Sequence, residues 1–275
     1  MRGEVIAMGR KIIFFDIDGT LTKCEKNIHK PTPETIRAIR KLKENRIYVA
    51  IATGRSKCFI QKSILELEPD ILICNNGAYI EMNGEVINSK PISKTYVVDI
   101  VNTGKIYEIP IVLESPECCY AVNMSLEERK RLIRNIAVES RFIKTVDEQK
   151  SFLEQFQIYK LIVILPTKEK FDIINRKYGN EFNILRQQSF YSYDFYPKNV
   201  SKGKGVRIIK EYVGNKLTES YAFGDDVNDM EMLNEADIGI AMGDGNEELK
   251  KHADYVTEPL EQEGISKMLT RLELI

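Results

Sequence analysis

The feature that most constrains this chain is the stretch Lys11–Thr22, with the sequence KIIFFDIDGTLT. Its apolar run, Ile12 to Phe15, is typical of a strand buried on both faces of a parallel sheet. Asp16 and Asp18 follow, and alternation along an extended chain sends both side chains to the same side. Open α/β sheets bind ligands at the carboxyl ends of their strands, so we expect both carboxylates at a ligand site. Such a pair suits Mg²⁺ and phosphoryl transfer, although a turn with solvated acids would also fit this short string.

The next segments repeat a strand–helix rhythm. The sequence Thr32-Pro33-Glu34 predicts a helix start, with a capping hydroxyl, a proline in the first turn and an acid behind it. Buried strands are predicted at Ile47–Ala52 and Ile71–Cys74, with a helix over Lys57–Leu67 between them. Polar residues follow each strand. This order predicts a Rossmann-like, doubly wound parallel sheet of the α/β class with a site along its carboxyl edge.

A different pattern occupies the middle of the chain. Asn83-Gly84 between two short β segments predicts a hairpin. Ser125 and Glu128 form a capping-box pattern that opens a helix predicted to run through Leu132 and Ile136. Strands and helices then mix without the strand–helix rhythm until about Asp194. We therefore expect a catalytic core of residues 1–82 and 195–275, with an inserted α+β domain of residues 83–194.

The rhythm returns with two further polar segments. The helix start SKGKG spans Ser201–Gly205, and GDDVND follows a strand at Gly224–Asp229. With DIDGT at Asp16–Thr20 and TGR at Thr53–Arg55, the chain carries four polar motifs in a fixed order. Together these motifs resemble those of the haloacid dehalogenase-like hydrolase superfamily, and of its Cof-type phosphatases in particular. The insert occupies the position of that family's type 2 cap domain, which would close over the core and select the substrate.

The resemblance implies a role for each motif residue. Asp16 would be the nucleophile and a Mg²⁺ ligand, and Asp18 would be the general acid and base, with its backbone carbonyl as a second ligand. Lys202 would neutralise charge on the nucleophile and the phosphate, with Lys204 as the alternative. The remaining implied positions are phosphate contacts at Thr53, Gly54 and Asn228, a metal ligand at Asp225 and an acid that supports the ligands from behind at Asp229.

Several residues stay open at this stage. Asn76 resembles a family position, but a turn role explains it nearly as well. The turn Gly243-Asp244-Gly245 departs from the GNA-like pattern of the family. Asp244 would add charge near the metal or, as we favour, cap the following helix. Cys118 and Cys119 are expected to be apolar filler, because no histidine lies near them. His29 and His252 are expected to be solvated.

Composition excludes several other classes. The 275 residues carry 40 basic and 41 acidic side chains, a net charge of −1, which does not predict a nucleic-acid partner. No apolar run approaches the length of a membrane span. The five cysteines have no C-x-x-C spacing, which argues against a zinc site or a disulfide framework. We expect a cytoplasmic protein without a signal peptide, and we predict neither an oligomeric state nor a role for residues 1–10.

The leading hypothesis is a Mg²⁺-dependent phosphatase that hydrolyses phosphate monoesters of small metabolites, including sugar phosphates, through an aspartyl-phosphate. A phosphomutase would share the nucleophile and the second acid but would return the phosphoryl group to its bound intermediate. A non-catalytic module that binds phosphorylated metabolites is the alternative of a different class. Intact polar residues in all four motifs argue against that module. A dehalogenase is disfavoured because it would not need Asp18.

Overall fold

A computed structural model describes residues 9–130, 143–145, 156–187 and 191–275 of the chain. The chain divides into two units. One unit, the core, consists of Met1–Gly54, Lys62–Asn88 and Ser201–Ile275. The other, the insert, consists of Arg55–Gln61 and Ser89–Val200.

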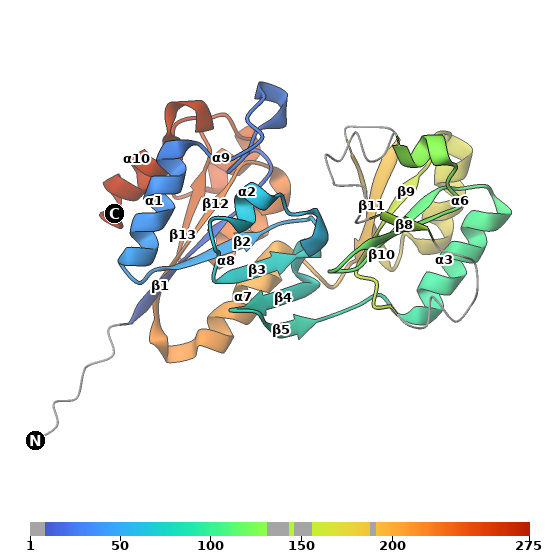
Figure 1. Ribbon diagram of the computed structural model, residues 1–275, viewed down its shortest axis with the longest axis horizontal. Coiled ribbons are helices and arrows are strands. Elements are labelled where there is room, and N and C mark those ends of the chain that lie inside the picture. The colour runs from blue at the N-terminus through green and yellow to red at the C-terminus, as the bar shows by residue number, and fades with distance from the viewer. Residues whose placement is uncertain (1–8, 131–142, 146–155, 188–190) are drawn as a thin grey trace, which may run out of the picture. The chain divides into compact units, whose positions relative to one another are not determined.

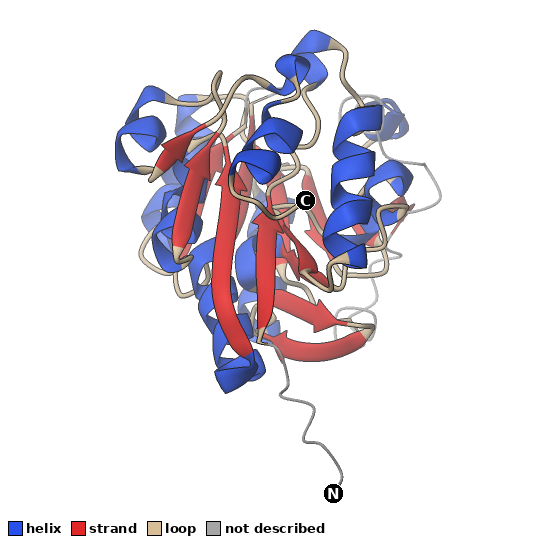
Figure 2. Ribbon diagram, turned by 90° about the vertical axis from the view of Figure 1, so that its left-hand side faces the viewer, coloured by secondary structure: helices blue, strands red, loops and turns tan. Residues whose placement is uncertain are grey.

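The core is built on one eight-stranded sheet, and Figure 2 shows helices along both sides of its strands. The six strands from β14 to β3 are parallel to one another, and β4 runs antiparallel to β3. The sheet is therefore a doubly wound α/β sheet, as predicted. Its strands, in spatial order, are β14 (Tyr255–Val256), β13 (Ile238–Ala241), β12 (Leu217–Gly224), β1 (Arg10–Phe15), β2 (Tyr48–Ala52), β3 (Ile71–Cys74), β4 (Tyr79–Met82) and β5 (Glu85–Ser89).

Apolar stripes attach the helices to this sheet. Helices α7, α8 and α9 share one hydrophobic cluster with the strands, in which Ile12 and Phe14 of β1 meet Val206 of α7. Helices α1 and α10 contact each other. Helix α1 begins as predicted, because the Thr32 hydroxyl accepts a hydrogen bond from the Thr35 amide. The helices of the core are α1 (Pro33–Glu44), α2 (Lys62–Leu65), α7 (Lys202–Val213), α8 (Met230–Glu235), α9 (Glu247–His252) and α10 (Gly264–Arg271).

The insert contains a six-stranded sheet with helices α3 (Lys94–Ile106) and α6 (Lys168–Tyr178) (Figure 1). From β10 to β7 each strand is antiparallel to the next one along the sheet, and β8 is parallel to β7. This mixture of helices and antiparallel strands is the α+β class that the sequence predicts. The strands, in spatial order, are β10 (Phe182–Arg186), β11 (Ser192–Pro197), β9 (Lys160–Ile164), β6 (Ile111–Glu114), β7 (Cys119–Val122) and β8 (Ile143–Thr145).

The unit boundaries differ from the predicted 1–82, 83–194 and 195–275. The Asn83-Gly84 turn forms the predicted hairpin, but β5 stays in the core sheet beside β4, so residues 83–88 group with the core. At the other end β11 continues to Pro197, which pairs with Phe182 of β10, and residues 195–200 group with the insert. Sheet pairing across the predicted boundaries explains both differences.

The predicted helix over Lys57–Leu67 is wrong in its first half. A 3-10 turn covers Lys57–Phe59, and only α2 is α-helical. Cys58 and Phe59 pack in an apolar cluster with residues of the insert, and this contact holds the chain in a turn there. The Ser125 capping box is present, with the Glu128 carboxylate accepting from the Ser125 amide at 2.7 Å. The continuation of that helix to Leu132 and Ile136 lies outside the described residues.

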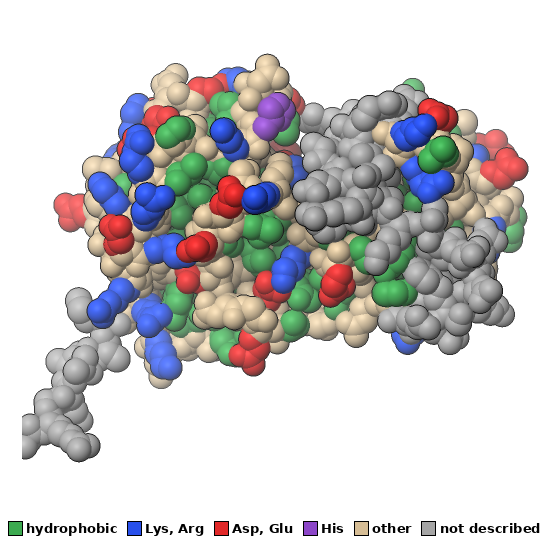
Figure 3. Space-filling view, viewed as in Figure 1, with side chains coloured by type: hydrophobic (Ala, Val, Ile, Leu, Met, Phe, Trp, Pro, Cys, Tyr) green, Lys and Arg blue, Asp and Glu red, His purple; other side chains and the backbone are tan. Residues whose placement is uncertain are grey.

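Surface charge agrees with the composition. On the described part of the face in Figure 3, Lys and Arg side chains alternate with Asp and Glu side chains and form no large patch of one sign. Within the described ranges, no helix combines the length and the apolar character needed to cross a bilayer.

Candidate active site

Loops that extend the core strands at their carboxyl ends form the site. The Asp16 amide donates to the Phe223 carbonyl at 3.0 Å, and the Thr53 amide donates to the Ile73 carbonyl at 2.8 Å. These bonds continue the sheet ladder one residue past the strands. The backbone amides of these first loop residues are therefore satisfied by the sheet.

The first loop separates the two acids of the DIDGT motif. Asp16 is buried, with 4% of its surface exposed, whereas Asp18 is exposed. The loop turns back at Gly19, whose amide donates to the Thr22 carbonyl at 2.7 Å. Thr20 points its hydroxyl across to Asp225, at 3.3 Å from Oδ1. A buried first acid and an exposed second acid suit different chemical roles.

Lys202 joins two of the acids. Its ammonium lies 2.6 Å from Asp16 Oδ1 and 2.6 Å from Asp229 Oδ1, and all three side chains are buried. Burial disfavours the charged form, but the two carboxylates outweigh it and hold the pKa of Lys202 above its ordinary value. Lys202 is the first residue of α7, where the helix dipole also disfavours a cation. Lys204, the alternative, is exposed.

The loop after β12 supplies the other two acids. Asp229 accepts from the amides of Asp225 and Asp226 at 3.0 and 3.3 Å through Oδ2, while Oδ1 binds Lys202. These bonds fold the loop so that the Asp225 carboxylate faces Thr20. Both carboxylate oxygens of Asp229 are therefore engaged, one by two backbone amides and the other by the Lys202 ammonium.

Carboxylate oxygens of Asp16, Asp225 and Asp229 all lie within 4.8 Å of one another. Burial raises the pKa of Asp16 well above its ordinary value; Lys202 opposes the rise, and the charges of Asp229, Asp225 and Asp18 add to it. Burial, followed by the charge of Asp229, raises the pKa of Asp225 to about 7. The cluster offers only oxygen ligands, which Mg²⁺ prefers, and a bound cation would relieve the repulsion between its carboxylates. The residues present therefore fit Mg²⁺.

The remaining motif residues lie along the same sheet edge. Thr53 is buried, and its carbonyl accepts from the Asn76 amide at 3.1 Å. Asn76 adopts a left-handed conformation with φ of 54° and lies close to Gly54. This geometry agrees with a turn role for Asn76. Asn228 is exposed in the loop that carries Asp229.

Asp244 has a role that the sequence did not predict. The residue that caps α9 is Asn246, whose side chain accepts from the Glu248 amide, so the favoured capping role of Asp244 was wrong. Asp244 instead forms an ion pair with Lys23, which follows the DIDGT loop. The Asn246 amide donates to the Asp225 carbonyl at 2.6 Å. The turn after β13 therefore contacts both acid-bearing loops.

Local sequence patterns carried no signal for two of these contacts. Lys23 reads as an ordinary solvated lysine, and its partner Asp244 is 221 positions away. The Thr20 hydroxyl likewise reaches Asp225, which is 205 positions away in the sequence. Only the parallel order of β1, β12 and β13 brings these loops together.

Comparison with known proteins identifies the family. The model of the haloacid dehalogenase-like hydrolases matches residues 13–269. The chain belongs to this family. As a member of this family it is a hydrolase of the phosphatase class, as the sequence predicts.

Relatives match over nearly the whole chain. A phosphoglycolate phosphatase of Archaeoglobus fulgidus is 26% identical over 275 residues, covering 96% of this chain and 98% of its own. The crystal structure of a Geobacillus kaustophilus HTA426 protein is 32% identical, with a TM-score of 0.85, over 97% of this chain and 100% of that one. The subclass IIB sugar phosphatase BT4131 is 30% identical, with a TM-score of 0.78, over 96% of this chain and 100% of its own.

Proposed function

We propose that this phosphatase hydrolyses phosphate monoesters of small metabolites by a Mg²⁺-dependent route through an aspartyl-phosphate on Asp16. The observation that carries the proposal is the buried Asp16–Lys202–Asp229 bridge beside Asp225. A buried carboxylate next to an ammonium can approach an anionic substrate without being repelled by it. Sugar phosphates are the class to test first, because BT4131 is a sugar phosphatase.

In the proposed reaction each motif residue has one task. The Asp16 carboxylate attacks phosphorus, and Asp18, exposed to solvent, donates a proton to the leaving oxygen. The same Asp18 then takes a proton from the water that hydrolyses the acyl phosphate on Asp16, which releases inorganic phosphate and restores the carboxylate. Lys202 neutralises charge on Asp16 and on the phosphoryl oxygens. Thr53, Gly54 and Asn228 are the proposed contacts that orient the phosphoryl group.

Asp16, Asp225 and the Asp18 carbonyl are the proposed ligands of Mg²⁺, which when bound would supply positive charge to the phosphoryl oxygens and to Asp16. Without that charge, three acids face a single lysine in this cluster. Asp229 keeps the ligands in place by its bonds to two backbone amides in the Asp225 loop.

The test is a phosphate-release screen over phosphorylated metabolites, weighted toward sugar phosphates, with Mg²⁺ and with excess EDTA. We expect release with Mg²⁺, loss of release with EDTA, and recovery when Mg²⁺ is restored. Full activity in excess EDTA would contradict the metal requirement.

The same screen separates hydrolysis from mutase activity. A mutase would interconvert phosphate positions on the substrate and release little inorganic phosphate. Following each reaction by ³¹P NMR detects both products. Isomer formation that outpaces phosphate release would replace the proposed function by the mutase alternative.

A further inference from the structure

Residues 55–61 carry a contact that the proposed chemistry does not use. They directly follow Thr53 and Gly54, the proposed phosphate contacts, yet they group with the insert. The chain passes between the two units four times, after Gly54, Gln61, Asn88 and Val200. The first of these passages begins one residue after Gly54, so this segment ties the phosphate-binding turn to the insert.

The segment lies on one face of the insert sheet. Strand register places Glu114 of β6 beside Cys119 of β7 and beside Lys160 of β9, so the three side chains share a face. The Ser56 hydroxyl donates to Glu114 Oε2 at 2.7 Å, and Cys58 Sγ lies 3.6 Å from Cys119 Sγ. Alternate residues of the same strands, such as Leu113 and Leu161, belong to the cluster that contains α3 and α6 on the other face.

The Ser56 hydroxyl binds Glu114 rather than capping the turn that it precedes. It occupies the N-cap position of the 3-10 turn Lys57–Phe59, where a serine side chain ordinarily accepts from a backbone amide. No such capping bond forms, because the hydroxyl is turned toward Glu114. Ser56 and Glu114 are both fully buried, so the bond is shielded from water.

Glu114 is itself held in place by charge. The Lys160 ammonium lies 3.5 Å from Glu114 Oε2 and 3.2 Å from Asp194 Oδ2, and Lys160 is 4% exposed. Burial raises the pKa of Glu114, while Lys160 opposes the rise. A buried carboxylate between a lysine and a serine has little freedom to move, so the position of Ser56 follows that of the insert sheet.

We propose that Glu114 of the insert, through Ser56, positions Thr53 and Gly54 for phosphate binding. Ser56 and Glu114 are thus positioning residues, and the inference rests on the proposed function of Thr53 and Gly54. Apolar packing of Cys58 and Phe59 with Val112 and Ile162 also holds residues 55–61 against the insert sheet. The insert would then act on phosphate affinity through the backbone of the TGR motif.

The test compares Ser56→Ala with two other variants. Ser56→Ala removes the hydroxyl and leaves Glu114 paired with Lys160. Glu114→Gln keeps an oxygen that accepts from Ser56. Thr103→Val is the matched control, since it deletes a buried hydroxyl, 2.7 Å from the Tyr178 hydroxyl, elsewhere in the insert. For each variant we would measure affinity for inorganic phosphate with Mg²⁺, affinity for Mg²⁺ alone, and amide exchange in residues 55–61.

We expect Ser56→Ala to weaken phosphate binding about fivefold, the loss of one net hydrogen bond. It should speed exchange of the Phe59 amide, which donates to the Ser56 carbonyl, and leave Mg²⁺ affinity unchanged. Glu114→Gln should stay within about twofold of wild type. Thr103→Val should change neither phosphate affinity nor this exchange. Wild-type phosphate affinity in Ser56→Ala, or equal losses in Ser56→Ala and Thr103→Val, would overturn the proposal.

The two proposals can fail separately. A wild-type protein that binds Mg²⁺ but releases phosphate from no compound in the screen would refute the proposed function. The exchange measurement still tests the seating of residues 55–61 in that case, and unchanged exchange in Ser56→Ala would refute the seating.

Discussion

Gly19 lies where a side chain would collide with a proposed metal ligand. A Cβ built there would come within 1.9 Å of Asp225 Oδ2, and the φ of Gly19 is +94°, a region that disfavours other residues. We expect Gly19→Ala to displace the Asp225 carboxylate and to weaken Mg²⁺ binding by about tenfold. Calorimetric titration with Mg²⁺ measures this.

Gly84→Ala is the matched control for that variant. Gly84 has a φ of +81° but no neighbour within 4 Å of its Cβ position, so its substitution imposes the same backbone strain without the collision. Equal Mg²⁺ affinity in the two variants would show that the approach of Gly19 to Asp225 does not matter for the metal.

Substitution of Asp16 and substitution of Asp18 should impair different steps of the reaction. Asp16→Asn removes the proposed nucleophile, so no phosphoenzyme should form. Asp18→Asn removes the proposed proton donor and base, which should slow turnover by about 10²–10⁴-fold. With a nitrophenyl phosphate, whose leaving group needs little protonation, Asp18→Asn should accumulate a phosphate adduct that intact-mass spectrometry detects after acid quench. An adduct on Asp16→Asn would mean that the roles are assigned wrongly.

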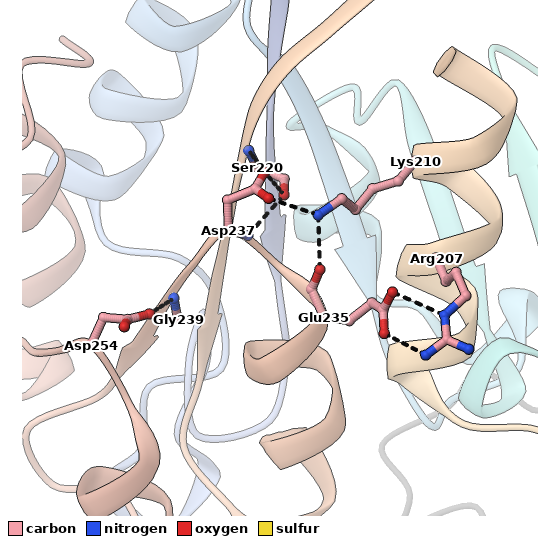
Figure 4. A network of polar contacts seen from close by, with 7 residues as sticks. All are labelled: Arg207, Lys210, Ser220, Glu235, Asp237, Gly239 and Asp254. Atoms are coloured by element: carbon pink, nitrogen blue, oxygen red, sulfur yellow. Dashed lines mark hydrogen bonds and ion pairs between the residues drawn. The ribbon is translucent and has the colours of Figure 1, made fainter. Parts of the chain in front are cut away.

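At the scale of elements, a polar network joins α7, α8 and the strands beside them (Figure 4). The Asp237 carboxylate accepts from the Ser220 amide at 2.8 Å and from the Lys210 ammonium at 2.9 Å. Arg207 and Glu235 form a two-bond pair at 2.9 and 2.7 Å. Asp237 precedes β13, so this network lies at the opposite end of that strand from Asp244. It can therefore be altered without touching the site.

The network makes stability depend on pH. Burial tends to raise the pKa of Asp237, but hydrogen bonds from Ser220 and Lys210 outweigh it and hold this pKa below its ordinary value. The stabilisation from ionised Asp237 is thus present above the unfolded-state pKa, near 3.8, and is lost as pH falls through the folded-state value. Asp237→Asn should lower the free energy of unfolding by about 1 kcal/mol or less at pH 7, since the side chain is half exposed.

Urea unfolding of wild type and Asp237→Asn from pH 7 down to pH 3 checks this. The difference between the two proteins should shrink below about pH 4. A difference that stays constant over the whole range would show that the charge of Asp237 contributes nothing. Phosphatase activity at pH 7 should be the same in both proteins.

A second contact between elements links the loop after β1 to the turn after β13. Asp244→Asn weakens the ion pair with Lys23 and should loosen the turn whose Asn246 amide holds the Asp225 carbonyl. We expect Mg²⁺ affinity to fall by about threefold, as for a partly buried ion pair. Lys251→Gln, which removes an exposed pair with Glu248, is the control and should have no effect. Equal affinity in both variants would exclude a role for Asp244.

The sequence predicted what local patterns encode. Asp16 could be predicted to lie at the site because a buried strand precedes it, whereas Lys202 was favoured over Lys204 only because its motif resembles that of the family. Three contacts join positions far apart in the sequence, and neither hydrophobic periodicity nor turn residues predict them. They are the Lys202–Asp229 bond, the Lys23–Asp244 ion pair and the Ser56–Glu114 bond. Sheet order decides such contacts. The same reason explains why the first half of the helix over Lys57–Leu67 was predicted wrongly and why the two units differ at their edges from the predicted domains.

At the scale of the whole molecule, removal of the insert should leave apolar side chains of residues 55–61 exposed on the remaining core. A core of residues 1–88 joined to 201–275 keeps residues 55–61, whose buried side chains include Cys58, Phe59 and Ile60. Their partners in the cluster with Val112 and Ile162 would be gone. We expect this core to aggregate or to bind a hydrophobic dye, and a version with polar residues at 58–60 to be monodisperse. Size-exclusion chromatography compares the two.

The four chain crossings also determine what can be exchanged between homologues. A chimera that takes residues 89–200 from a relative would set a foreign sheet face against the resident Ser56 and Cys58, with no selection for their fit. The whole insert could then be transplanted only by moving two separate stretches of gene, 55–61 and 89–200, in one step. Recombination at a single pair of breakpoints would separate residues 55–61 from residues 89–200. We therefore expect the two segments to vary together among functional homologues.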